Sequence, residues 1–309
     1  MVIIGGPAES APVVRDEAII FELLNTGEVD LSEGVARELS KKESITQIRR
    51  IGLFKGKHRI RAAFRDKSYR SHQVAITRSK IRYNDAYYNE LAAYLISRYL
   101  GLNIIPPTVS RSLKISKTGL TASEELLPGT LQLWVENSMV LFDLKKEGIP
   151  YPGSLADKNS QIKEIKAFDC IIGNVDRHEG NILVDLNKRF DSAMRQSNEV
   201  QVYLGKLWAI DHSRSFYKGP MRSSICRLSK LAEGAVSRQF IQGMRNWDIN
   251  EVKELLRSSG LSDKQVQSLH LDSVEGRFQK VKNHIENEQR KSGKPDSEFY
   301  SSGRWHQVK

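Results

Sequence analysis

The chain has 309 residues, with 48 lysines and arginines against 37 aspartates and glutamates, and a formal net charge of +11. This length suits one two-lobed domain or two small domains. No apolar run of about twenty residues occurs, so the sequence predicts no transmembrane helix. The start of the chain lacks a basic stretch followed by an apolar one, so we expect no secretory signal and, for a bacterial chain, a cytoplasmic protein.

The two cysteines, Cys170 and Cys226, do not indicate a disulfide framework in a chain of this length. Cys170 lies in the apolar run 168–172, which favours a small buried side chain over a nucleophile. The sequence shows no Cys and His cluster with the spacing of a metal site.

The first elements in chain order are an acidic extension and a strongly basic segment. Apolar side chains alternate with acids between residues 17 and 33, a pattern that fits either a helix or a strand. Residues 41–82 follow with 14 Lys and Arg against 2 acids, a net charge of 14 − 2 = +12 that accounts for the whole excess. The basic residues fall within strand-like hairpins, and neither helix-turn-helix nor zinc-finger spacing is present.

The next elements are a helix and a strand. Residues 87–102 have apolar side chains at near-helical spacing, with Gly101 at the end and Pro106 and Pro107 barring continuation. Residues 129–135 alternate as a half-buried strand does. Farther on, helices are expected at 248–257 and 274–288, and the tail 290–309 lacks periodicity and is expected to be mobile.

The chemistry is concentrated in two short segments, 173–184 and 207–216. The first has Asp176 and, five residues later, Asn181 at the start of an apolar strand. The second has Asp211 at the end of another apolar strand, and the stretch 191–199 between them is polar, as a loop would be. If the two strands pair, Asn181 and Asp211 lie at the same end. One carboxylate to take a proton and two oxygen ligands for a hard cation are what phosphoryl transfer requires.

These segments resemble the catalytic and metal-binding loops of an atypical kinase superfamily. The pattern Asp-Arg-His-x-x-Asn, followed by a strand and Ile-Asp-x-x-x-x-Phe, is similar to phosphatidylinositol 3- and 4-kinases, HipA-like bacterial kinases and Golgi secretory-pathway kinases. The resemblance covers about residues 45–220. The amide at Asn181 favours the first two branches. The resemblance implies an α+β, two-lobed protein-kinase-like fold, with a β-rich small lobe plus one helix and a mainly helical large lobe.

The resemblance also implies a role for each site residue. Asp176 is expected to be the catalytic base, supported by Arg177 and His178, and Asn181 and Asp211 are expected to hold the metal. Glu90, on the predicted helix, resembles the glutamate that pairs with the phosphate-binding lysine. That lysine is replaced by Arg65, with Lys67 as a substitute candidate, and a Gly-x-Gly-x-x-Gly turn is missing. The segment framing the adenine is expected at Gln132, Leu133 and Trp134.

The predicted function is an ATP- and Mg²⁺-dependent (or Mn²⁺-dependent) kinase that acts on an unidentified hydroxyl acceptor, which could be a protein, sugar, lipid or metabolite. The alternatives are a nucleotide-binding pseudokinase or scaffold, motivated by Arg65 and the poor glycine turn, and an adenylyl or glutamyl transferase on the same fold. The basic segment 41–82 is interpreted first as serving ATP phosphates or an anionic substrate, then as a solvated face, with nucleic-acid binding possible but not favoured.

The expected domain organisation has four parts. Residues 1–40 are an extension packed on the small lobe, 41–135 the nucleotide-binding small lobe, 136–289 the catalytic large lobe, and 290–309 the tail.

Overall fold

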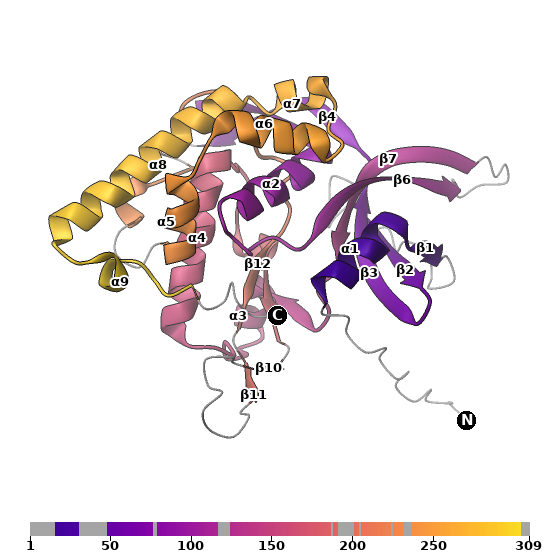
Figure 1. Ribbon diagram of the computed structural model, residues 1–309, viewed down its shortest axis with the longest axis horizontal. Coiled ribbons are helices and arrows are strands. Elements are labelled where there is room, and N and C mark those ends of the chain that lie inside the picture. The colour runs from indigo at the N-terminus through magenta and orange to yellow at the C-terminus, as the bar shows by residue number, and fades with distance from the viewer. Residues whose placement is uncertain are drawn as a thin grey trace.

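The computed structural model describes residues 16–30, 48–76, 79–116, 124–186, 188–190, 201–203, 205–223, 225–231 and 236–303. The stretch 191–199, expected to be a polar loop, lies outside these residues. The described chain forms a β-rich lobe and a mainly helical lobe that meet along one helix, α2 (Figure 1). The predicted two-lobed α+β architecture is confirmed.

The small lobe is a five-stranded antiparallel sheet with strand order β1-β2-β3-β7-β6. Helix α1 lies across this sheet (Figure 1) and buries Ile20, Leu23 and Leu24 against it. Asp16 accepts hydrogen bonds from the first backbone amides of α1, so the ambiguous acidic extension begins as a capped helix. The elements of this lobe are α1 (Glu17–Thr26), β1 (Glu28–Asp30), β2 (Arg49–Lys55), β3 (His58–Arg65), β6 (Thr108–Ser116) and β7 (Glu124–Leu133).

Three further elements lie between β3 and β6 in the chain. Strands β4 (Ser68–Ile76) and β5 (Ser79–Ala86) pair with each other as a hairpin. Helix α2 (Tyr88–Tyr99) follows directly and ends before Gly101, whose φ of 73° suits glycine.

The large lobe is built on the long helices α4 and α8, which pack against each other, and on a small sheet of strand order β12-β9-β8. A separate antiparallel pair is formed by β10 and β11. The elements of this lobe are β8 (Ser138–Val140), α3 (Leu141–Lys146), α4 (Leu155–Ile172), η1 (Glu179–Asn181), β9 (Ile182–Asp185), β10 (Lys188–Phe190), β11 (Gln201–Tyr203), β12 (Leu207–Ala209), η3 (Leu228–Lys230), α5 (Arg238–Arg245), α6 (Ile249–Ser258), α7 (Asp263–Ser268), α8 (Leu271–Ser292) and α9 (Asp296–Phe299).

The buried side chains of helix α2 join the core of the large lobe, and the helix also packs against β6 and β7 of the small lobe. Its apolar side chains Leu91, Tyr94 and Ile96 join the same buried cluster as α4, α5 and α8, whereas α1 and the five-stranded sheet form a separate cluster. At the end of α2, the Tyr99 hydroxyl contacts Glu251 Oε2 at 2.6 Å and accepts the Asp248 amide at 3.1 Å. The end of helix α2 is therefore bonded to the large lobe, at α6 and the residue before it.

The C-terminal region differs from the expected mobile tail. Helix α8 continues to Ser292 and α9 follows, because Phe299 and Tyr300 are buried against the large lobe. The segment has few apolar residues, so its sequence shows no helical periodicity. Its two buried aromatic rings nevertheless pack against the core. Residues 304–309 lie outside the described part of the chain.

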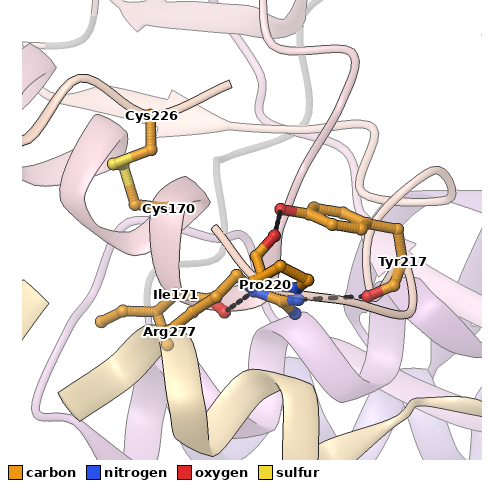
Figure 2. The surroundings of a disulfide bond; sticks show 6 residues. All are labelled: Cys170, Ile171, Tyr217, Pro220, Cys226 and Arg277. Carbon is orange, nitrogen blue, oxygen red and sulfur yellow. Dashed lines mark hydrogen bonds between the residues drawn. A yellow bond between two sulfur atoms is a disulfide. The ribbon is translucent and has the colours of Figure 1, made fainter. Parts of the chain in front are cut away.

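The expectation of unpaired cysteines is wrong, since Cys170 and Cys226 form a disulfide with their Cα atoms 5.2 Å apart (Figure 2). Cys170 is buried on α4, as predicted, but its sulfur is bonded and not merely packed. Fifty-six positions separate the two cysteines. The bond joins the helix that leads into the segment 173–184 to the chain that follows the segment 207–216.

A buried arginine fastens the same two parts of the chain. Arg277 on α8 donates to the carbonyl oxygens of Ile171 and Tyr217, at 2.9 and 3.1 Å, and lies over the Tyr217 ring (Figure 2). Burial lowers the pKa of Arg277 to about 10. A cation at the C-terminal end of α4 is also favoured by the helix dipole.

Among the described residues, no helix combines the length and apolar character needed to cross a membrane.

Loss of the disulfide is expected to lower the free energy of unfolding by about 4 kcal/mol, because the bond closes a loop of 56 positions in the unfolded chain. Urea unfolding of the wild type with and without reductant measures this. The double variant Cys170→Ser/Cys226→Ser is the control and should not respond to reductant. Identical wild-type curves after thiol titration has verified complete reduction would contradict the prediction.

Candidate active site

Pairing of β9 with β12 brings the two predicted metal ligands to the same end of a sheet. Ala209 lies opposite Ile182, and the Ile210 amide donates to the Asn181 carbonyl oxygen at 3.1 Å. Asn181 therefore directly precedes one strand, and Asp211 follows the other by two residues. Both strands are apolar and almost entirely buried, as a short continuous apolar run predicts.

The loop predicted to be catalytic begins where α4 ends, at Ile172. Gly173 adopts a left-handed conformation with a φ of 67°, and a Cβ there would lie 2.6 Å from the Tyr217 ring. Asn174 then donates to Asp169 Oδ1 at 3.1 Å and accepts the Asp176 amide at 3.0 Å. The Asn181 side-chain amide donates to the Asp176 carbonyl oxygen at 3.1 Å. The Asp176 backbone is thus held on both sides, while its carboxylate is 31% exposed.

The side chain of Arg177 is buried and supports the loop by hydrogen bonds within the protein. Its guanidinium donates to the Asp169 carboxylate at 2.9 Å and to the carbonyl oxygens of Asn181 and Ile210. It therefore ties α4 to the ends of both β9 and β12. His178 is exposed, and its Nδ1 accepts the Gly180 amide at 3.0 Å.

Arg65 makes the contacts that the resemblance assigned to a lysine. From the last position of β3, its Nε lies 3.4 Å from Glu90 Oε1 and its Nη2 lies 3.2 Å from Asp211 Oδ1. Arg65 and Glu90 are both buried, whereas Asp211 is partly exposed. Lys67 lies two residues farther on, half-buried, with its carbonyl oxygen accepting the Tyr87 amide at 3.2 Å.

Asp211 adopts an unusual backbone conformation, with a φ of 59°. Aspartate tolerates the left-handed region better than most residues, but the conformation still requires support. Ser213 supplies part of it by donating from its hydroxyl to Asp211 Oδ1 at 3.1 Å. The turn directs the carboxylate toward Arg65.

His212, the residue after Asp211, connects the loop that follows β12 with the buried side chains of Glu90 and Arg177. Its backbone amide donates to Glu90 Oε1 at 3.0 Å, and its Nε2 lies 2.8 Å from Arg177 Nη2. Because arginine only donates, Nε2 must accept. The ring proton therefore lies on Nδ1, which is 3.5 Å from Glu90 Oε2.

The charges of the site displace the proton affinities of its carboxyls in opposite directions. Burial alone would raise the pKa of Glu90, but Arg65 and the contacts with His212 lower it to about 2. Burial raises the pKa of Asp176, and the negative charges of Asp211 and Asp85 act in the same direction, while Arg214 opposes them. Burial lowers the pKa of Arg65, but the facing Asp211 and Glu90 more than offset this and keep the group charged.

The residues predicted to frame the adenine lie at the end of β7 and just after it, and all three are half-buried. The Gln132 side chain donates to the Thr108 hydroxyl at 3.0 Å, the Leu133 amide to the Pro107 carbonyl oxygen at 2.8 Å, and the Trp134 amide to the Arg61 carbonyl oxygen at 2.9 Å. These contacts fix the connection between the lobes. They do not test nucleotide binding.

The donor set at Asn181 and Asp211 fits a hard divalent cation. The Asn181 amide nitrogen is engaged by the Asp176 carbonyl oxygen, so the amide oxygen is left as a ligand. Magnesium commonly takes one or two carboxylates and completes its octahedron with water and phosphate. No group of three or more His, Cys, Asp or Glu side chains with metal-binding geometry occurs in the described ranges, so a cation here would depend on phosphate oxygens as well.

The basic segment is partly neutralised by acids, three of which lie outside it in the sequence. Ion pairs join Arg49 to Asp66, Lys55 to Glu22, Arg59 to Asp30 and Arg61 to Glu136. Arg65 is directed into the site. The described part of 41–82 therefore presents less free positive charge than the sequence suggested, which weakens the case for a nucleic-acid surface.

Several residues at the site were not identified from the sequence. Asn174 and Arg214 lie inside the two motif segments, but no pattern gave them a role. Asp169 lies in a run that reads as apolar core, and Asp85 belongs to no motif. The available signal was a polar residue within an otherwise apolar stretch, as for Asp169.

No protein-family model matches the chain, and no curated protein matches it. The solved structures that are similar to this chain include three of kinases. The crystal structure of the Golgi casein kinase has a TM-score of 0.52 at 16% identity, covering 94% of this chain and 80% of that one. The Golgi casein kinase with Mn/ADP bound has a TM-score of 0.48 at 17% identity, covering 89% of this chain and 77% of that one. The Helicobacter pylori proinflammatory kinase CtkA has a TM-score of 0.42 at 12% identity, covering 86% of this chain and 97% of that one.

The likeness to the Golgi casein kinase shows the fold of this chain, which is that of an atypical kinase. At this level of identity it does not carry activity, substrate or ligands across. The finer relationship to phosphatidylinositol kinases and HipA-like proteins stays a prediction.

Glu90 is expected to make stability depend on pH. Its pKa is about 2 in the folded chain and 4.5 when unperturbed, so its stabilising effect is complete above the unfolded value and is lost as pH falls toward the folded one. The effect at neutral pH is on the order of 3 kcal/mol. Urea unfolding of the wild type and Glu90→Gln at pH 7 and pH 3 should show a gap that narrows in acid.

The exposed Glu254 provides the matched control, because Glu254→Gln removes a carboxylate that lies in solvent. Its curves should follow the wild type at both pH values. A gap for Glu90→Gln that is equally wide at pH 7 and pH 3 would show that the buried ion pair is not the cause.

Proposed function

We propose that the protein is a phosphotransferase that moves the γ-phosphoryl group of ATP to a hydroxyl acceptor. The observation that supports this best is the convergence of three segments. Arg65 and Glu90 position Asp211 from one side, and the β9–β12 pairing supports Asn181 and Asp176 from the other. These are one candidate base, two candidate oxygen ligands and one fixed cation brought to the same place.

Each residue has a definite task in the proposed reaction. Asp176 accepts the proton of the acceptor hydroxyl as that oxygen forms its bond to the γ-phosphorus, and the bond from the γ-phosphorus to the bridging oxygen breaks to release ADP. Arg65 holds the phosphates in place of lysine with a planar, permanently charged group. Asn181 and Asp211 would hold Mg²⁺ or Mn²⁺, which when bound neutralises charge on the phosphates. Arg177 and His178 keep the loop in shape.

The raised pKa of Asp176 is consistent with its role as a base. A carboxylate with a greater proton affinity than usual is a better proton acceptor. Glu90 is the opposite case, because its low pKa keeps it charged and opposite Arg65.

A pseudokinase or scaffold is the second candidate, and one observation favours it. Arg65 is already engaged by two carboxylates, so phosphates must compete with Asp211 for its guanidinium. An adenylyl or glutamyl transferase on the same fold is the third. The products separate the three: ADP from a kinase, pyrophosphate from an adenylyl transferase and neither from a scaffold.

We infer an oxidising location for the folded chain in place of the cytoplasm expected from the sequence. The disulfide between Cys170 and Cys226 is buried, and cytosolic thiols are generally kept reduced. Alkylation of free thiols in cells lysed directly into denaturant distinguishes the two, since cytosolic protein would then be modified at both cysteines.

Asp176→Asn and Asp211→Asn are each expected to lower kcat by about a thousandfold or more, because the first removes the proton acceptor and the second a metal ligand. The Tm should stay nearly unchanged for Asp176→Asn, whose carboxylate is partly exposed. The measurement is ADP formation with ATP and Mg²⁺, accompanied by mass analysis of the protein for self-phosphorylation.

Calorimetric titration with ATP plus Mg²⁺ separates binding from turnover. Asp211→Asn should weaken binding in the presence of the metal, while Asp176→Asn should bind as the wild type does. Full turnover in Asp176→Asn would refute the role assigned to it, and wild-type binding without turnover would support the scaffold.

A further inference from the structure

Arg214 lies three residues after Asp211 and is bonded to two carboxylates at once. Its Nη1 is 3.0 Å from Asp176 Oδ2, and its Nε is 3.0 Å from Asp85 Oδ2. Asp85, near the end of β5, is buried, whereas Asp176 is partly exposed. One guanidinium thus connects the carboxylate of the candidate base to the buried carboxylate of Asp85.

The backbone around Arg214 is held as firmly as its side chain. The Ser213 carbonyl oxygen accepts the Ala86 amide at 3.0 Å and the Asn89 side-chain amide at 2.6 Å. The Arg214 carbonyl oxygen accepts the Val175 amide at 3.4 Å. The guanidinium is therefore placed by contacts with β5, α2 and the catalytic loop, before any ligand binds.

The direction of the bonds decides which oxygen of Asp176 remains for chemistry. Arg214 bonds to Oδ2 of Asp176. The backbone amide and carbonyl of Asp176 are bonded to the side chains of Asn174 and Asn181. Oδ1 is the oxygen that Arg214 leaves available to the acceptor proton. Without the guanidinium, the carboxylate could rotate and would face the negative charges of Asp85 and Asp211 uncompensated.

We propose that Arg214 is a positioning residue for the reaction, which holds the Asp176 carboxylate in its productive orientation and is itself anchored by Asp85. The inference rests on the proposed function. Lysine cannot replace it, because one compact ammonium cannot reach two carboxylates in different directions as a planar fork does.

The test is a set of steady-state measurements on Arg214→Ala, Arg214→Lys and Asp85→Asn in the full chain. For Arg214→Ala, kcat should fall about a hundredfold, as misplacement of a catalytic group typically costs, and Arg214→Lys should recover little of it. The Kd for ATP with Mg²⁺ should stay within about twofold, because Arg214 bonds the base and not the candidate metal ligands. Asp85→Asn should have a smaller effect in the same direction.

Chemical rescue separates positioning from a general structural role. Guanidinium added at concentrations far below those that unfold the protein should restore part of the kcat of Arg214→Ala and should leave its Tm unchanged. Arg245→Ala is the matched control, because Arg245 also forms a 3.0 Å ion pair, with Asp296, but both partners are exposed and lie on α5 and α9. Its kcat should equal that of the wild type with and without guanidinium.

The outcomes distinguish this inference from the proposed function. If Asp176→Asn is inactive while Arg214→Ala has a wild-type kcat, the inference is overturned and the phosphotransferase stands. If Arg214→Ala loses activity together with its melting transition, or guanidinium fails to restore turnover, the role is structural and the inference is again overturned. Full activity in Asp176→Asn overturns both.

Discussion

The buried charge network centred on Glu90 is the constraint on which the rest of the site depends. Glu90 faces Arg65 on β3 and both the amide and the ring of His212, and His212 in turn contacts Arg177. Removing one member would leave a charge in the interior without its partner, which is far more costly than never having had the pair. The network therefore fixes three segments relative to one another: β3, α2 and the loop around Asp211.

The packing of α2 explains how this network can be held without a ligand. Its apolar face lies in the core of the large lobe, and its last turn bonds to α6 through Tyr99. Glu90 is consequently presented by the body that also carries Asp176 and Asn181. Arg65 reaches the site from the five-stranded sheet, so a movement of that sheet relative to α2 would change the contacts of Arg65 with Glu90 and Asp211.

The chain that follows Asp211 is fastened at successive points along its length. Arg214 bonds to the Asp176 carboxylate. Arg277 donates to the Tyr217 carbonyl oxygen, and Cys226 is bonded to Cys170 on α4 (Figure 2). Helix α4 ends at the loop that contains Asp176. Through the disulfide it also supports the segment that follows Asp211. The strained turn at Asp211 is thus followed by three fixed points.

The sequence by itself determined the motif residues Asp176, Asn181 and Asp211 and the helix carrying Glu90, because their signals are local: residue types at fixed spacing beside apolar strands, and helical periodicity ended by glycine and proline. Only the tertiary structure decided that Arg65 faces both Glu90 and Asp211, that Asp85 meets Arg214 across 129 positions, and that Cys170 bonds to Cys226. Contacts between distant segments depend on how the lobes pack, and no spacing along the chain encodes them. The same reason explains the buried tail, where Phe299 and Tyr300 pack against a core formed by residues far earlier in the chain.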